Sequence, residues 1–289
     1  MKTPLLKYII SLLILGSNGI VSSLIHLNSY EIVFLRTMVG SVVLIAIFLL
    51  TGGKFTFYQN KKDALFLLIS GMALGGSWMF LYEAYASIGV GVASLCYYCG
   101  PMIVMMLSPV VFNEKLTAAK IAGFIAVVLG VCLVNGRGSA ALNSRGLFSG
   151  LMSAVIFAIM VIFNKKAKSI TGLENSAMQV LISFLTVAAF VGIKQGYNIP
   201  LQTSEIPAML FLGVVNTGIA CYLYFSSIGR LPVQTVSILG YLEPLAAVVF
   251  SALLLNEKMS STQMLGAALI LGGAIFTEYC EIRNRSVQI

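Results

Sequence analysis

Long apolar runs, separated by short polar segments, make up most of the chain. Each run holds about 20 residues, which is the length that an α-helix needs to cross a hydrocarbon core of about 30 Å. The runs are too long and too continuous for barrel strands, which alternate over about 10 residues. The pattern predicts ten membrane-spanning helices, at residues 5–24, 28–51, 63–86, 89–112, 118–135, 145–164, 174–193, 205–227, 231–255 and 261–280. The count is nine if 205–227 and its neighbour are wrongly divided.

Composition supports the same class of protein. Of the 289 residues, 58% are hydrophobic and 10% are charged, and the mean hydropathy is +0.96. A soluble globular chain carries about 25% charged residues. Because only helices and closed barrels satisfy every backbone polar group in lipid, we expect an all-α integral membrane protein. Residues 1–24 are followed by no small-residue cleavage site and soluble domain, so we interpret them as the first span rather than a signal peptide.

The positions of Lys and Arg predict the orientation in the membrane. With a cytoplasmic N-terminus, 13 basic residues fall in cytoplasmic segments, Arg36 lies within a span, and four fall in outer segments (Arg137, Arg145, Lys194 and Lys258). Cytoplasmic loops carry the basic excess, so both termini are expected in the cytoplasm, in a multi-pass protein of the plasma membrane. The net charge of +8 thus reflects topology, and no basic cluster interleaved with aromatic residues indicates a nucleic-acid partner.

The two halves of the chain repeat one another. A shift of 143 residues places the Asn-Glu-Lys sequence at Asn113 on the one at Asn256, and Pro101 on Pro244. Each unit has five spans, an odd number, so the second unit must enter the membrane from the opposite side. Inverted repeats are typical of alternating-access carriers, although duplication also builds channels and some membrane enzymes. The predicted units are residues 1–135 and 145–289, joined by a loop at 136–144.

These features resemble the drug/metabolite transporter superfamily, and within it the ten-helix EamA-type carriers. The similarity consists of two five-span units, Arg36 early in the second span, the Glu243-Pro244 pair and the two Asn-Glu-Lys sequences, and it covers essentially the whole chain. It implies a central cavity lined by both halves, and export of amino acids, other small metabolites or toxic compounds. It implies no particular substrate. The halves also differ, because Gly100 stands where the second half has Glu243.

Three charged residues within the predicted spans form a candidate proton-coupling or charge network, because a charge in a membrane helix is costly unless it is paired or faces water. Glu83, near the end of the third span, either binds a cationic group or a proton, or points into water at the helix end. Glu243 either faces the cavity or braces the kink produced by Pro244. Arg36 either makes a structural contact, with Glu83 or Glu243 as possible partners, or binds a substrate carboxylate. Pro101 and Pro244 are the predicted hinges.

Aromatic and amide side chains supply the other candidate contacts. Trp78 and Tyr82 recur at helical spacing, so an aromatic wall near Glu83 would suit an amine through cation–π attraction. Aromatic belts at membrane interfaces explain some of these positions without any site. Asn18 lies among small residues, which either allow close helix packing or leave its amide free for a ligand. The predicted substrate-binding residues are Glu83, Trp78, Asn18, Tyr82, Tyr98, Tyr222 and Tyr241.

Several other functions lack a supporting pattern. The chain has one His and no paired Asp, nucleophile or phosphate-binding Gly loop, so no enzyme activity and no cofactor are expected. No GxxxxGK[ST] sequence is present to bind ATP. Cys96 and Cys99 have the spacing of a partial metal site, but further ligands are missing and small packing residues are the simpler interpretation.

The sequence thus predicts a secondary transporter, with export as the expected direction, for a small amine-bearing or zwitterionic metabolite such as an amino acid. Its expected partners are this small-molecule substrate, the lipid bilayer and possible coupling protons, while the oligomeric state is left open. A membrane channel is the alternative, although it would show rings of carbonyls or charges. A non-transporting scaffold or sensor is the other, although such proteins usually have a soluble output domain.

Overall fold

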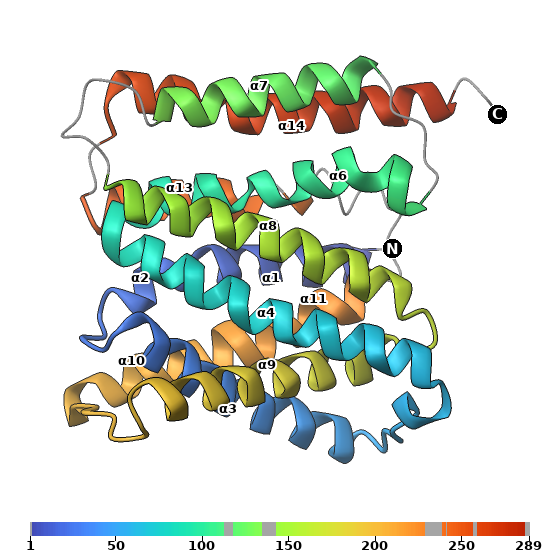
Figure 1. Ribbon diagram of the computed structural model, residues 1–289, viewed down its shortest axis with the longest axis vertical. Coiled ribbons are helices and arrows are strands. Elements are labelled where there is room, and N and C mark those ends of the chain that lie inside the picture. The colour runs from blue at the N-terminus through green and yellow to red at the C-terminus, as the bar shows by residue number, and fades with distance from the viewer. Residues whose placement is uncertain are drawn as a thin grey trace.

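A computed structural model gives the arrangement of the chain, and it describes residues 2–112, 118–134, 143–228, 239–240, 242–256 and 259–286. Within these ranges the secondary structure is helical, without strands. Helix α1 begins, and helix α14 ends, on the same side of the bundle (Figure 1). We call this side the termini end, and the other side the opposite end.

The helices follow the predicted apolar runs, and several runs contain more than one helix. Their bounds are α1 (Lys2–Gly16), α2 (Asn18–Ser22), α3 (Ser29–Leu50), η1 (Phe57–Gln59), α4 (Lys61–Ile88), α5 (Val90–Tyr97), α6 (Cys99–Phe112), α7 (Ala118–Val134), α8 (Ser144–Lys166), α9 (Gly172–Lys194), η2 (Thr203–Glu205), α10 (Ile206–Leu210), the π-helical η3 (Phe211–Ile219), α11 (Ala220–Ile228), α13 (Leu242–Leu254) and α14 (Ser261–Ser286).

Six helical stretches among the described residues are long and apolar enough to cross a membrane. They are Thr3–Ser22, Ser29–Leu50, Lys61–Ile88, Ser144–Lys166, Gly172–Lys194 and Thr203–Tyr224. Shorter apolar helices of 10–17 residues lie at Val90–Val104, Ile121–Gly130, Leu242–Leu254 and Met264–Gly273. The chain is therefore an all-α integral membrane protein, while the count of ten spans stays a prediction.

Local sequence explains where the helices begin and break. The Asn28 side chain accepts the Glu31 N–H and Glu31 accepts the Asn28 N–H, a capping box that fixes the start of α3. The fourth predicted span is interrupted at Tyr98, between α5 and α6. Pro101 explains this break, because it lacks the N–H that would bond the carbonyl of Tyr97 in a continuous helix. A hinge role for Pro101 stays a prediction.

The helices pack in pairs drawn from both halves of the chain. Helix α4 packs along α8, α3 along α9, and α1 along α11 and α13, while α5 contacts both α8 and α13. Helices α7 and α14 lie side by side as a separate layer, which meets the rest of the bundle through α5 and α6 (Figure 1). The interior of the protein therefore lies among α1, α3, α4, α5, α9, η3 and α13.

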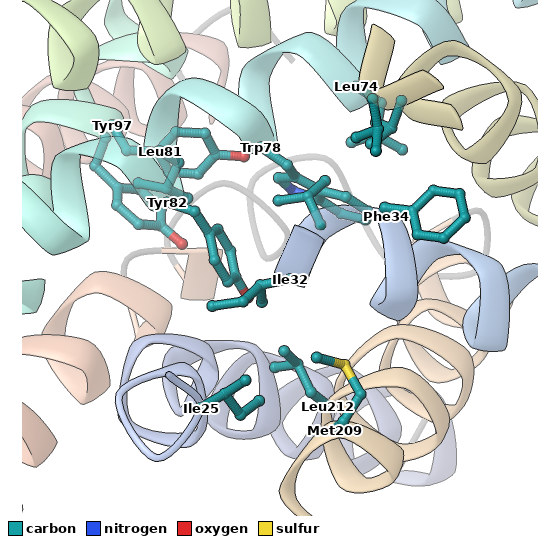
Figure 2. Packing of buried hydrophobic residues seen from close by; sticks show 14 residues of the cluster. Ile25, Ile32, Phe34, Leu74, Trp78, Leu81, Tyr82, Tyr97, Met209 and Leu212 are labelled. Atoms are coloured by element: carbon teal, nitrogen blue, oxygen red, sulfur yellow. The ribbon is translucent and has the colours of Figure 1, made fainter. Parts of the chain in front are cut away.

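The largest buried cluster combines side chains of α3, α4, α9, α10 and η3 with two tyrosines around the α5–α6 break. Figure 2 shows Trp78 and Tyr82 of α4 in this cluster, together with Phe34 of α3 and Leu212 of η3. In a membrane such contacts stabilise the bundle through close packing, because lipid tails are as apolar as the side chains themselves.

The contact between α7 and α14 gives a test of this packing. A Cβ added at Gly273 would lie 2.7 Å from the Ala126 Cβ and 3.0 Å from the Gly123 carbonyl oxygen, whereas one added at Gly272 meets nothing within 4 Å. We expect Gly273→Ala to lower the unfolding free energy by about 1–3 kcal/mol through overpacking. Gly272→Ala, the control, should be neutral or slightly stabilising because Ala favours helix. Thermal unfolding in detergent measures both, and equal melting temperatures would contradict the packing.

Candidate functional site

A fully buried arginine lies at the centre of the bundle. Arg36 of α3 has an exposed fraction of 0%. Its Nε donates to the Thr217 hydroxyl of η3 at 3.0 Å, and its Nη1 donates to the Tyr82 hydroxyl of α4. Its Nη2 is buried and has no hydrogen-bond partner among the described residues. Arginine stays charged in proteins, and both of these hydrogen bonds of the cation go to neutral hydroxyl oxygens.

Aromatic rings of α4 cover the guanidinium. The Trp78 ring centroid lies 4.4 Å from the Arg36 Cζ, and the Tyr82 centroid lies 5.2 Å from it. Trp78 and Tyr82 are four residues apart, so they lie on one face of the helix, as the sequence predicted. Cation–π attraction stabilises the charge by about 2 kcal/mol or more where water is excluded. The predicted aromatic wall therefore faces Arg36, and Figure 2 shows both rings within the same buried cluster.

Glu243 approaches this arginine from the second half of the chain. It lies in the first turn of α13, within electrostatic reach of Arg36 but outside salt-bridge distance. The Tyr98 hydroxyl, at the α5–α6 break, lies beside Glu243. That hydroxyl is buried and makes no hydrogen bond of ordinary geometry with the described residues. A cation of α3 and a carboxylate of α13 thus lie within electrostatic reach of one another.

Two buried amides add further unused polar atoms. The Asn216 Nδ2 of η3 donates to the Ile14 carbonyl at 2.7 Å and to the Ser17 hydroxyl at 2.9 Å, where α1 gives way to α2. The Oδ1 atoms of Asn216 and Asn18 are both buried without a partner in the described part of the chain. Since buried polar atoms are nearly always hydrogen-bonded, such a set indicates a place for a polar ligand or for water.

The remaining predicted residues lie elsewhere. Glu83 forms an ion pair with Arg145 at 3.0 Å, with exposed side-chain fractions of 21% and 73%, at the opposite end of the bundle. It is therefore a partner of Arg145 and not of Arg36. The Tyr222 ring lies beneath the Lys7 ammonium, at 5.8 Å from its centroid. Tyr241 lies outside the described residues.

The two predicted hinge prolines occupy matching places. Pro101 is the third residue of α6 and Pro244 is the third residue of α13, so each lies in a first helical turn, where a proline is tolerated. Glu243 immediately precedes the buried Pro244, which brings its carboxylate to the start of a helix, where negative charge is favourable.

Sequence reasoning missed Thr217 and Asn216. Both are neutral, and both lie in an apolar run, where a charged residue would have been noticed more easily. The signal that could have found them is the presence of two adjacent polar residues in the middle of a predicted span. The π-helical turns of η3 present both side chains toward the interior, and the Thr217 hydroxyl also donates to the Leu212 carbonyl five residues earlier, at 2.9 Å.

A metal centre finds no support in the described ranges, where no group of three or more His, Cys, Asp or Glu side chains could hold an ion. Cys96 and Cys99 are buried free thiols, and the Cys99 Sγ donates to the Leu95 carbonyl at 3.7 Å.

Two tyrosines provide a test of the arginine site. Tyr82→Phe removes the acceptor of the Arg36 Nη1 and leaves a second buried N–H unpaired. We expect a stability loss of about 1–3 kcal/mol in the absence of substrate. Tyr58→Phe, the control, removes a hydroxyl from a side chain that is 66% exposed and should cost far less. Thermal unfolding of both variants measures the difference. Equal losses would show that the Tyr82 hydroxyl does not hold Arg36.

Known proteins are similar over the whole chain. The EamA-like transporter family matches residues 3–136 and again 144–279. The chain is 27% identical over 286 residues to the uncharacterized transporter YxxF of Bacillus subtilis (strain 168). The aligned region covers 96% of this chain and 89% of that protein. It is 25% identical over 246 residues to the threonine/homoserine exporter RhtA of Escherichia coli (strain K12), covering 83% and 79%.

A solved crystal structure has a similar fold. It matches with a TM-score of 0.69 at 20% identity and covers 95% of this chain and 97% of that chain. The family match extends over nearly all of both halves, and the relatives are named as transporters. The chain belongs to the EamA-like transporter family.

Proposed function

We propose that this protein exports a small zwitterionic metabolite of the amino-acid type by alternating access. The observation that carries the proposal is Arg36, a fully buried cation whose Nη2 has no partner among the described residues. A charge inside a membrane protein is costly unless it is paired or hydrated, and such charges mark substrate pathways. A carboxylate that binds the free Nη2 would supply the missing anion.

The other groups of the site support a zwitterion over a simple anion. Glu243 faces the same region from α13, so a molecule with its carboxylate at Arg36 can direct its ammonium toward Glu243 and the Tyr98 hydroxyl. The unpaired Oδ1 atoms of Asn18 and Asn216 are acceptors for an ammonium or a hydroxyl. The rings of Trp78 and Tyr82 hold Arg36 itself, so their role is to position the cation rather than to bind an amine.

Helix contacts support two inverted five-helix repeats, at 1–135 and 145–289. Each of these predicted spans has a counterpart at the same place in the other half: the span of α1 corresponds to that of α8, the span of α4 to that of α11, and the span of α5 and α6 to that of α13. When every span is replaced by its counterpart, the α4–α8 pair becomes α1–α11 and the α6–α8 pair becomes α1–α13. Both resulting pairs are in contact. The α3–α9 and α5–α13 pairs exchange with themselves. Each half also matches the family separately. Carriers of this design bind substrate at the interface of the repeats near the midplane, where Arg36 of α3 contacts Thr217 of η3 here.

Export is the proposed direction because one relative is named as a threonine/homoserine exporter, although at 25% identity. The excess of basic residues on one side supports a plasma-membrane protein with both termini in the cytoplasm. Proton coupling through Glu243 or Glu83 remains part of the proposal, as does the two-proline hinge at Pro101 and Pro244.

Ligand binding tests the substrate class. Threonine and homoserine should each raise the melting temperature of the purified protein, because a ligand that binds the folded state stabilises it. Their decarboxylated amines should not, since they lack the group that pairs with Arg36. Arg36→Lys should weaken zwitterion binding on the order of 30-fold or more, because truncating one partner of a buried charge pair costs about 2–5 kcal/mol.

Arg145→Lys is the matched control, because Arg145 is exposed and should bind no substrate. If the amines bind as well as the zwitterions, the role of Arg36 is wrong. Saturable counterflow of labelled threonine in liposomes separates a carrier from a channel, which would give none.

Transport as a function of pH tests the coupling carboxylate. Glu243→Gln removes the titratable group that faces Arg36, so we expect the flux to lose its pH dependence in liposomes with an imposed proton gradient. Glu83→Gln examines the other candidate, which is paired with Arg145. Loss of pH dependence in Glu83→Gln alone would assign the coupling to Glu83. An unchanged profile in both variants would exclude proton coupling through either residue.

A further inference from the structure

Four buried carboxylates tie the two halves of the chain together at the two ends of the bundle. Their exposed fractions lie between 4% and 8%, and each accepts hydrogen bonds from a loop that belongs to the other half. In the described part of the chain none of the four forms a salt bridge with Lys or Arg. They are Glu31 and Glu205 at the opposite end, and Asp63 and Glu174 at the termini end.

At the termini end both carboxylates bind main-chain N–H groups. Glu174, at the start of α9, accepts the N–H groups of Thr56 and Phe57, the latter at 2.8 Å, and the Thr56 hydroxyl at 2.6 Å. Asp63, at the start of α4, accepts the Ser169 N–H at 2.7 Å. The first contact joins α9 to the loop after α3, and the second joins α4 to the loop after α8.

At the opposite end two carboxylates likewise bind the other half, one through a main-chain N–H and the other through a side-chain amide. Glu205, just before α10, accepts the His26 N–H at 2.6 Å, and its Oε1 lies 2.9 Å from the His26 Nδ1. Glu31 accepts the Gln195 Nε2 at 2.9 Å. The repeat shift of 143 residues relates Glu31 to Glu174 and His26 to Ser169, and Asp63 lies 142 residues before Glu205.

We propose that these four carboxylates are the latches of alternating access and set the balance between its two open states. Glu31 and Glu205 hold the opposite end closed, and Glu174 and Asp63 hold the termini end closed. All four contacts coexist in this structure, so both ends are held and Arg36 is sealed from water. Opening one end requires its two loops to leave the other half, and the bonds broken are charge-assisted ones, which are about twice as strong as neutral ones.

The proposal rests on the alternating access of the proposed function, but not on the substrate. In a two-state carrier, weakening the latches of one end raises the population open at that end and lowers the population open at the other. A static brace would behave differently, because its loss would loosen only its own surroundings. The response of the distant end therefore separates a latch from a brace.

Hydrogen–deuterium exchange of the full chain in lipid nanodiscs, without substrate, measures both ends at once. Glu205→Gln should speed exchange at 23–28 and 195–205 by about tenfold or more, because it weakens hydrogen bonds to a charged group. The same variant should slow exchange at 51–60 and 166–171. Asp63→Asn should give the reverse pattern. Faster exchange at the altered end with no slowing at the other end, in both variants, would overturn the proposal.

Lys194→Gln is the matched control. Lys194 is exposed and contacts the Tyr30 ring of the other half at 3.8 Å, also at the opposite end, so its loss should change exchange at neither end by more than about twofold. If Glu205→Gln or Asp63→Asn does not fold, Gln195→Ala and Thr56→Val remove a single donor from each end and must show the same opposed pattern. Zwitterion binding at Arg36 is measured separately, so either proposal can fail alone.

Discussion

A buried guanidinium without a salt bridge in the described part of the chain is the constraint on which the rest of the structure depends. Arg36 cannot lose its proton, and moving a charge out of water without an ion pair is costly in a membrane protein. Two hydroxyl acceptors and the face of Trp78 offset part of this cost. In the proposed function an anion neutralises the remainder, so binding of a carboxylate would also relieve the protein of an unsatisfied charge.

Helices from both halves supply the residues that surround Arg36. Arg36 comes from α3, Tyr82 from α4, Thr217 from η3, and the opposing Glu243 from α13. A relative movement of the halves would therefore change the contacts of the cation directly. A ligand shifts the equilibrium between the two open states of the proposed cycle only if it makes different contacts in each state. The division of the site between the halves provides such a difference.

The sequence predicted features that depend on neighbours along the chain. Apolar runs predicted the helices, and the four-residue spacing of Trp78 and Tyr82 predicted their common face. A lone Arg36 in a span was recognised because charge is rare there. The sequence left tertiary pairing open: Glu83 meets Arg145, which is 62 positions away, and no local pattern indicates that contact. Thr217 was missed because a neutral hydroxyl in an apolar run is usually satisfied by its own helix.

The internal repeat indicates contacts between distant parts of the chain better than any single motif does. Glu31 and Glu174 are equivalent under the shift, and each is the carboxylate through which a helix start binds the other half. Among the described residues Glu174 accepts three hydrogen bonds from the other half and Glu31 accepts one, and in the proposal the balance between the two ends decides which end opens. The half-specific residues, Glu243 against Gly100 above all, break that balance at the centre. In the proposed cycle the repeated carboxylates permit both states, and the asymmetric site gives the substrate its influence over them.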